Sequence, residues 1–167
     1  MKEKLKYAYM DTAQRFAELS TAEKRKVGAV IVKDGMMFPG YNGTPSGWSN
    51  VCERIIRMPT GAGEWLDQDE IESTWRWKDQ QGRYRMETLP EVLHAERNAL
   101  DKITQSTISS RQASLFVTCT PCLECAKSIH GAGISEVYYV TDRTNTAGVD
   151  FLKKCGIHVE QLTSTEI

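Results

Sequence analysis

Residues 113–141 read ASLFVTCTPCLECAKSIHGAGISEVYYVT, and this stretch decides the fold. The β-branched and aromatic runs at 113–118 and 136–141 are typical of buried strands. Between them, Thr120 and Pro121 form a common helix start, an N-cap residue followed by proline at the first helical position. The stretch therefore predicts two parallel strands connected by a helix in a right-handed crossover.

The alternation of strands and helices continues toward the C-terminus. Residues 146–154 predict a helix, Gly156 ends it, and residues 157–162 predict a further strand. The second half of the chain is thus strand, helix, strand, helix, strand. We therefore expect an α/β fold with parallel pairing in this half.

The first half of the chain predicts a helix and a hairpin. Residues 2–19 carry apolar side chains at nearly every fourth position, which is typical of an amphipathic helix. The β-branched run at 27–32 and the Asp34-Gly35 pair predict two antiparallel strands joined by a tight turn. Residues 39–47 are rich in glycine and proline, so we expect a loop there.

Residues 53–90 have the weakest pattern in the chain, with Trp65, Trp75 and Trp77 set among charged side chains. We expect an insert here, within a single domain that spans residues 1–167. The tryptophans favour local packing or a contact between subunits over base stacking.

Length and composition narrow the possible functions. The chain has 167 residues, with 21 Lys and Arg against 22 Asp and Glu, and its net charge of −1 gives no basic field to attract nucleic acid or an anionic membrane. The charged N-terminus leads into no apolar segment, and no run approaches the roughly 18 apolar residues of a membrane span. We therefore expect a soluble, cytoplasmic protein with a small-molecule substrate and no nucleic-acid or membrane partner. Five cysteines, an odd number, favour metal binding over a disulfide framework.

The residues of a candidate metal site are His94, Glu96, Cys122 and Cys125. A structural zinc takes four protein ligands, whereas a catalytic zinc takes three and leaves the fourth position to water. Cys122 and Cys125 are three residues apart in the first turn of a predicted helix, so their sulfur atoms share one face. His94 and Glu96 can serve the same site if their helix, predicted over 94–104, begins near His94.

An open zinc site beside a carboxylate is suited to activating water. Zinc lowers the pKa of bound water from about 16 to about 7, which supplies hydroxide at neutral pH. Glu96 can then take the water proton and pass it to a ring nitrogen and to a leaving amine. The alternative is a structural zinc knuckle with a fourth ligand from Cys119, Cys52 or another residue, but a knuckle does not need the His-x-Glu pair. His-x-Glu followed by Pro-Cys-x-x-Cys is the signature of zinc nucleobase deaminases.

Four segments carry a resemblance to a known family. They are KVGAVI at 26–31, GYNGTP at 40–45, HAERNA at 94–99 and CTPCLECAK at 119–127. In these segments the chain resembles the deoxycytidylate (dCMP) deaminases of the cytidine and deoxycytidylate deaminase superfamily, which include viral members. The resemblance implies an α/β fold of three layers, α/β/α, with a central mixed sheet of about five strands and an insert before the His-Ala-Glu helix.

The resemblance also implies a reaction and the residues that perform it. The family hydrolyses dCMP to dUMP and ammonia, which supplies dUMP for thymidylate synthesis in the cytoplasm, or in the host cytoplasm for a viral member. It implies one catalytic Zn²⁺ per chain, held by His94, Cys122 and Cys125. Zinc-bound hydroxide attacks C4 of the pyrimidine while Glu96 transfers protons.

By the same resemblance, three residues contact the nucleoside part of the substrate. The Ala95 amide meets the pyrimidine carbonyl, the Thr120 carbonyl meets the exocyclic amine, and Asn42 meets the deoxyribose. Lys26 is a candidate for the phosphate, although the basic run 24–26 is equally typical of a solvated patch.

The resemblance extends to assembly and regulation. Many dCMP deaminases are hexamers that dCTP with Mg²⁺ activates and dTTP inhibits, so we expect a homohexamer with effector contacts at Tyr41 and Gly43. A plain turn is the alternative for the loop at 40–45. Some viral members bind a second, structural zinc before the first strand and in the insert. This chain has Lys24 and Arg25 before that strand and no histidine in the insert, so we expect one zinc.

Other functions are compatible with the zinc motif. A tRNA-adenosine or DNA-cytidine deaminase needs basic surface to bind phosphates, and the net charge of −1 argues against it. A deaminase of free nucleosides or guanine differs in having no need of a 5′-phosphate. A nonenzymatic, zinc-stabilised interaction module would leave Glu96 dispensable.

Overall fold

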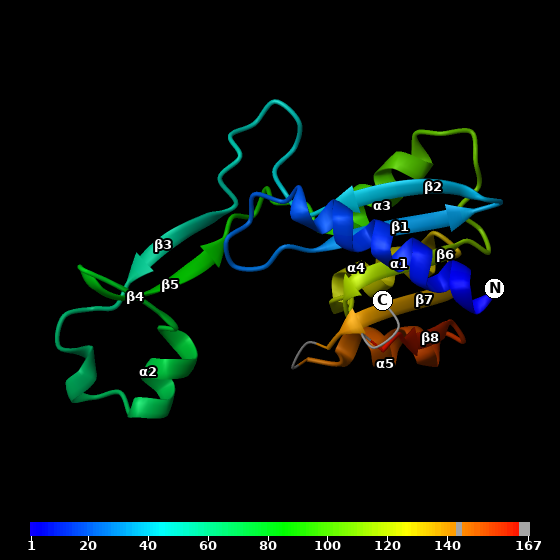
Figure 1. The fold of residues 1–167 in the computed structure, drawn as a ribbon. Coiled ribbons are helices and arrows are strands. Elements are labelled where there is room, and N and C mark those ends of the chain that lie inside the picture. The colour runs from blue at the N-terminus through cyan, green and yellow to red at the C-terminus, as the bar shows by residue number, and fades with distance from the viewer. Residues whose placement is uncertain (143–144, 164–167) are drawn as a thin grey trace.

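The structure, a computed structural model, describes residues 1–142 and 145–163. Its centre is a mixed five-stranded sheet (Figure 1). In spatial order the strands are β2 (Met36–Tyr41), β1 (Gly28–Lys33), β6 (Ser114–Cys119), β7 (Glu136–Thr141) and β8 (His158–Gln161). Strand β1 is antiparallel to both of its neighbours, whereas β6, β7 and β8 are parallel. The predicted hairpin and the predicted parallel half of the sheet are both confirmed.

Helices cover both faces of this sheet (Figure 1). They are α1 (Glu3–Glu18), α3 (Ala95–Thr104), α4 (Leu123–Gly131) and α5 (Ala147–Lys154). Helix α1 packs on one face and the other three pack on the opposite face, which gives the predicted three layers. The helices predicted over 2–19, 94–104 and 146–154 are confirmed to within one residue at each end. No helix of the described residues is long and apolar enough to cross a membrane.

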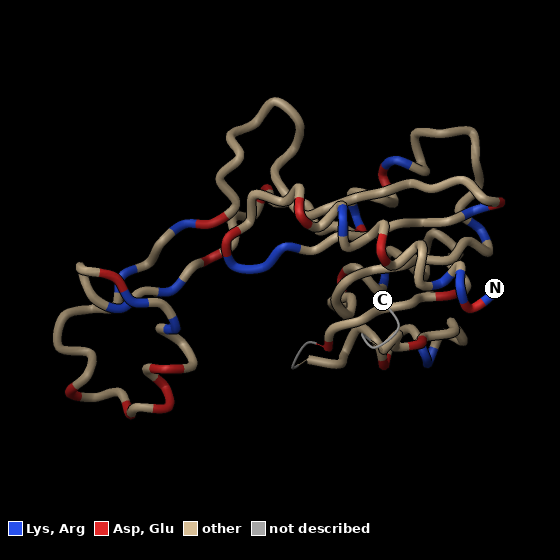
Figure 2. Tube along the Cα trace, in the orientation of Figure 1, with Lys and Arg blue, Asp and Glu red and all other residues tan. Residues whose placement is uncertain are grey.

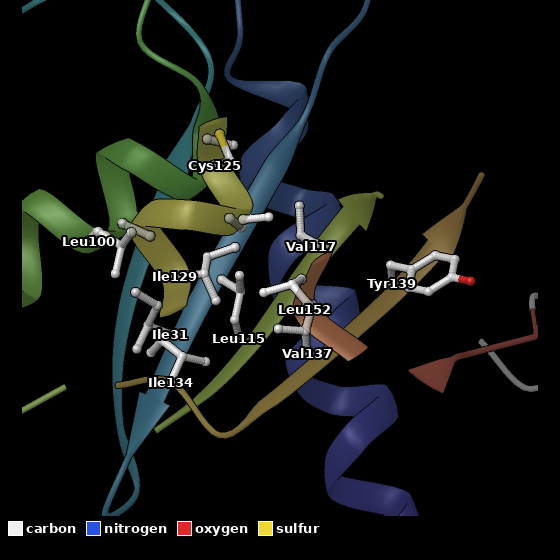
Figure 3. Packing of buried hydrophobic residues seen from close by; sticks show 14 of the residues in the cluster. Ile31, Leu100, Leu115, Val117, Cys125, Ile129, Ile134, Val137, Tyr139 and Leu152 are labelled. Carbon is white, nitrogen blue, oxygen red and sulfur yellow. The ribbon is translucent and has the colours of Figure 1, made fainter. Parts of the chain in front are cut away.

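The alternation of side chains along the strands divides the core into two clusters. Val30 and Phe116 belong to the cluster under α1, whereas Ile31 and Leu115 belong to the cluster under α3, α4 and α5. Figure 3 shows this second cluster, which reaches Cys125 near the start of α4. Because both faces are buried, these strands appear in the sequence as continuous apolar runs. The candidate metal ligand Cys125 is therefore anchored in the larger core.

Residues 39–41 belong to β2, so the loop predicted over 39–47 is wrong for its first three residues. Pro39 is tolerated because β2 is an edge strand, where a missing backbone N–H costs no interior hydrogen bond. Gly40 is required by packing, because a Cβ at this position would lie 2.4 Å from the carbonyl oxygen of Ala95 in α3. Pro39 thus marks the edge of the sheet, and Gly40 marks the close contact between β2 and α3.

Residues 53–88 form an arm that projects from the rest of the molecule (Figure 1). Its elements are β3 (Glu53–Arg57), the 3₁₀ turn η1 (Ala62–Glu64), α2 (Gln68–Thr74), β4 (Trp77–Asp79) and β5 (Gly82–Thr88). The three strands form a separate antiparallel sheet in the order β3-β5-β4. The insert predicted at 53–90 therefore has a sheet of its own.

Cross-strand pairs stabilise the sheet of the arm. The rings of Trp77 and Tyr84 stack with centroids 6.3 Å apart, and the guanidinium of Arg57 lies 5.1 Å from the Tyr84 centroid. Arg57 also forms an ion pair of 2.6 Å with Asp79. A cross-strand aromatic pair such as Trp77 with Tyr84 contributes roughly 0.2–1 kcal/mol. The arm thus depends on aromatic and charged contacts more than on a large apolar core.

Candidate active site

The N-termini of α3 and α4 bring the four candidate side chains together. His94 is the N-cap of α3, in an extended conformation, and Glu96 lies in the first turn of the same helix. Cys122 is the N-cap of α4, and Cys125 follows three residues later. The prediction that the first of these helices begins near His94 is confirmed.

Helix α4 begins at Leu123, so the helix start predicted at Thr120 and Pro121 is wrong. The reason is the identity of the capping group. The sulfur of Cys122 accepts a hydrogen bond from the backbone N–H of Cys125 at 3.5 Å, in the place that a hydroxyl oxygen usually takes. One side chain is therefore both the cap of the helix and a candidate metal ligand.

Three ligand atoms have the spacing of a tetrahedral zinc site. Nδ1 of His94 lies 3.6 Å from Sγ of Cys122 and 3.3 Å from Sγ of Cys125, and all three atoms lie within 4.8 Å of one another. With Zn–S near 2.3 Å and Zn–N near 2.0–2.1 Å, tetrahedral geometry separates nitrogen and sulfur by about 3.6 Å. Imidazole and thiolate are also ligands that zinc prefers. The three side chains therefore fit one Zn²⁺ with an open fourth position.

The other cysteines considered as a fourth ligand have different neighbours. Within residues 1–142 and 145–163, neither Cys119 nor Cys52 joins the ligand cluster. The sulfur of Cys119 accepts a hydrogen bond from Nη1 of Arg25 at 3.2 Å, and the sulfur of Cys52 lies 3.4 Å from the hydroxyl of Thr21. This described part of the chain offers three ligands, the number that a catalytic zinc takes.

The surroundings of the two cysteines favour one thiolate. The pKa of Cys122 falls to about 3, because the thiol of Cys125 and then the ring of His94 hydrogen-bond to its sulfur. The pKa of Cys125 rises, because it shares this hydrogen bond with Cys122 and is buried, and the nearby charge of Glu96 raises it further. Since zinc binds thiolates, metal binding must release the proton that the two sulfurs still share.

Glu96 places a buried carboxyl group beside the ligand cluster. It is 1% exposed, and with His94 and Ala95 it lines a cavity of about 520 Å³. The N-terminus of α3 favours negative charge in its first turn, which offsets part of the cost of burying a carboxylate. A carboxyl group in this position is suited to accept and donate protons at a ligand in the cavity.

The sequence model described as "Cytidine and deoxycytidylate deaminase zinc-binding region" matches residues 3–141. The chain belongs to this deaminase family. The deoxycytidylate deaminase of Enterobacteria phage T4 is 32% identical over 149 residues, which are 80% of this chain and 77% of that protein. The deoxycytidylate deaminase of Mycobacterium phage D29 is 31% identical over 132 residues, which are 78% of this chain and 90% of that protein.

A solved structure supports the same family and fold. The crystal structure of the dCMP deaminase from cyanophage S-TIM5, in complex with dCMP and dUMP, is 36% identical in sequence with a TM-score of 0.74. The match covers 97% of this chain and 99% of that chain. The predicted fold and the predicted enzyme class, a zinc-dependent deaminase, are therefore confirmed.

The deaminase holds Asn42 in a fixed position on the wall of the cavity. Oδ1 of Asn42 accepts a hydrogen bond from the backbone N–H of Val27 at 2.8 Å, and Nδ2 donates to the carbonyl of Arg25 at 2.9 Å. A carboxamide has two lone pairs and two N–H groups, so one of each can still serve a ligand. The loop that contains Asn42 thus supports the segment before β1.

The other residues predicted to bind substrate or effector lie in different environments. Ala95 lines the cavity, and Thr120 is 2% exposed at the end of β6. Lys26 is exposed and is not among the lining residues of the cavity. Tyr41 ends β2, and Gly43 forms an isolated bridge just after it, and neither residue lines the cavity.

Several lining residues of the cavity have no counterpart in the sequence predictions. Lys24 and Arg25 line it, although Lys26 is the predicted phosphate ligand. Glu53 and Arg76 come from the arm. Motif spacing carries no signal for Arg76, because its approach to the zinc ligands depends on how the arm folds. The basic run at 24–26 does predict a cation near the phosphate, but spacing alone does not show which of its three residues binds it.

Proposed function

We propose that this deaminase converts dCMP and water to dUMP and ammonia. The observation that carries the proposal is the similarity to the cyanophage S-TIM5 enzyme, which was solved with dCMP and dUMP and matches 97% of this chain. The similarity to the deoxycytidylate deaminases of phages T4 and D29 supports the same substrate. We place the reaction in the cytoplasm, where it supplies dUMP for thymidylate synthesis.

His94, Cys122 and Cys125 are the proposed ligands of one Zn²⁺ per chain. The chemistry that zinc supplies in such a site is the activation of water as a nucleophile at neutral pH. Two of the ligands, His94 and Cys122, are helix N-caps, so the start of a helix fixes the backbone of each. This preorganisation reduces the conformational entropy lost when the metal binds.

Glu96 is the proposed proton carrier. Its carboxylate accepts one proton from the attacking water and donates it to N3 of the pyrimidine. It then moves the second water proton from the oxygen at C4 to the exocyclic nitrogen, which leaves as ammonia. One water is consumed, N3 of the product keeps one proton, and the oxygen remains as the new carbonyl. The burial of Glu96 limits exchange of these protons with solvent.

Two of the proposed substrate contacts, Asn42 and Ala95, line the cavity, and the third, Thr120, is buried just after β6. The Ala95 N–H donates to the pyrimidine carbonyl, and the Thr120 carbonyl accepts from the exocyclic amine. Asn42 contacts the deoxyribose through the lone pair and N–H that its backbone bonds leave over. Together these groups orient C4 toward the zinc site.

We also propose that the enzyme is regulated as a homohexamer. In this proposal dCTP with Mg²⁺ activates, dTTP inhibits, and Tyr41 and Gly43 contact the effector. Their position outside the lining of the cavity is compatible with a site separate from the substrate site. Sedimentation analysis and dCMP kinetics with each nucleotide test the proposal, and a monomer insensitive to both nucleotides would refute it.

One assay tests the proposed reaction against its competitors. Ammonia release is measured with dCMP, deoxycytidine, CMP, dCTP and guanine at equal concentrations. We expect turnover of dCMP to exceed that of deoxycytidine, because the cations of the cavity have no partner in a nucleoside. Turnover of guanine alone, or no turnover of any pyrimidine, would overturn the proposal.

A further inference from the structure

Two arginines from distant parts of the chain line the same cavity as the zinc ligand His94. Arg25 precedes β1, and Arg76 lies between α2 and β4 of the arm. In Figure 2 the segment 24–26 is coloured for Lys and Arg, whereas the strands of the arm carry both colours, with Glu53 and Glu87 near the ends that join the domain. The arm therefore contributes one arginine, Arg76, and one glutamate, Glu53, to the lining of the cavity.

The segment that contains Arg25 is fixed by side chains from three parts of the fold. The carboxylate of Glu53, the first residue of β3, accepts hydrogen bonds from the backbone N–H groups of residues 23 and 24 at 3.2 and 3.3 Å. The amide nitrogen of Asn42 donates to the Arg25 carbonyl oxygen, and the sulfur of Cys119 accepts from the Arg25 guanidinium. Arg25 is thus held at the cavity before any ligand arrives, which lowers the entropic cost of binding.

Within the described residues Arg76, Arg83 and Arg85 of the arm form no ion pair, and Arg76 is the one of these three that lines the cavity. Arg54 and Arg57 form ion pairs with carboxylates of the arm. Neither Arg25 nor Arg76 forms an ion pair with a carboxylate in residues 1–142 or 145–163. Arg76 instead stacks over Trp77, with its guanidinium carbon 5.7 Å from the ring centroid. Stacking orients the guanidinium and leaves its N–H donors available to an anion.

We propose that Arg76 of the arm and Arg25 bind the 5′-phosphate of the nucleotide substrate. The inference rests on the proposed function and adds a role for the arm, which would distinguish a nucleotide from a nucleoside. A phosphate monoester carries a charge of about −1.5 to −2 at pH 7 and three acceptor oxygens, which matches two guanidinium groups. The arm then acts as a specificity element that leaves the zinc chemistry unchanged.

The test compares Arg76→Ala with Lys78→Ala. Lys78 is an exposed cation two residues away in the same arm, and it does not line the cavity, so it controls for loss of charge. We expect Arg76→Ala to raise KM for dCMP roughly tenfold or more, the size of a lost charge-assisted hydrogen bond, and to leave kcat within about twofold. Its effect on deoxycytidine should be small, and Arg76→Lys should recover part of the dCMP affinity.

A binding measurement makes the test independent of turnover. Calorimetric titration with dUMP and with deoxyuridine should show weaker dUMP binding in Arg76→Ala than in Lys78→Ala, with deoxyuridine binding unchanged. Equal dUMP affinity in the two variants, or equal losses for dUMP and deoxyuridine, would overturn the role of Arg76. Absence of ammonia release from dCMP by the unmodified enzyme would refute the proposed function instead, and the titration would still decide whether Arg76 binds phosphate.

Discussion

Replacement of Gly148 by alanine tests whether α5 positions the zinc ligands. Gly148 is buried in the first turn of α5, against the loop that leads into α4. A Cβ at this position would lie 2.1 Å from the carbonyl oxygen of Pro121 and 2.9 Å from the carbonyl carbon of Cys122. These atoms are backbone, so they cannot rotate away as a flexible side chain can.

The magnitude follows from the size of this overlap. Ordinary contact begins near 3.4 Å, so α5 or the Pro121–Cys122 backbone must move by more than 1 Å. Ligand distances in a well-formed zinc site lie within about 0.2 Å of their standard values, so a shift of this size disturbs the site. We expect a zinc affinity about 10- to 100-fold lower, as for the loss of a group that supports a ligand, and a free energy of unfolding lower by roughly 1–3 kcal/mol.

Two measurements and one control variant separate these effects. Urea unfolding with a chelator present gives the stability of the metal-free protein, and competition with a chromophoric chelator gives the zinc affinity. Gly131→Ala is the control, because Gly131 ends α4 and a Cβ there would meet no heavy atom within 4 Å beyond its own helix backbone and chain neighbours. Alanine at this position should be neutral or stabilising by about 0.4–1 kcal/mol. If Gly148→Ala matches Gly131→Ala in both measurements, the argument from close packing is refuted.

The remaining predictions concern the reaction and its substrate. Glu96→Gln should keep its zinc, measured by metal analysis, and lose roughly 10²- to 10⁴-fold in ammonia release, and retained activity would contradict the proton-carrier role. Cys122→Ser should lose zinc and stability together, because metal binding at such a site contributes folding free energy, whereas unchanged zinc content would mean that the ligand set is wrong. Arg25→Ala should raise KM for dCMP by more than Lys26→Ala does, because Arg25 lines the cavity and Lys26 does not. The opposite order in steady-state kinetics would indicate that Lys26 binds the phosphate. Glu53→Ala should raise the same KM while Glu53→Gln, which keeps an acceptor for the 23–24 amides, raises it less, and equal effects would argue against positioning by hydrogen bonds.

The central sheet could be predicted from sequence because its pattern is local. Strands β6 and β7 are buried on both faces, so they appear as apolar runs, and Gly156 marks the end of α5. The predictions fail where a tertiary contact overrides a local preference. Gly40 suggests a loop in the sequence, but in the structure it allows the close contact between β2 and α3. Thr120 suggests a helix cap, but the cap of α4 is Cys122, whose sulfur accepts a hydrogen bond from the first turn of the helix.

The arm could not be predicted for a different reason. Charged side chains are spread through its three strands, and the pairs that stabilise it, such as Trp77 with Tyr84 and Arg57 with Asp79, join residues across strands. Arg57 and Asp79 are 22 residues apart, which is beyond the window of about 11–18 residues that a pattern search uses. Motif analysis also misses the side chains of the arm that line the cavity, including Arg76, because their position depends on these long-range contacts.

The same distinction separates the chemistry of the site from its specificity. The zinc ligands and Glu96 lie at two helix N-termini, so two short motifs are enough to place them. The candidate phosphate ligands instead come from segments that only long-range contacts bring together, namely the Glu53 bonds to the 23–24 amides and the fold of the arm around Arg76. It follows that a relative with the same motifs and a different insert should keep the zinc and proton chemistry yet differ in its preference for a 5′-phosphate. A shortened arm in this chain that kept full discrimination between dCMP and deoxycytidine would contradict that argument.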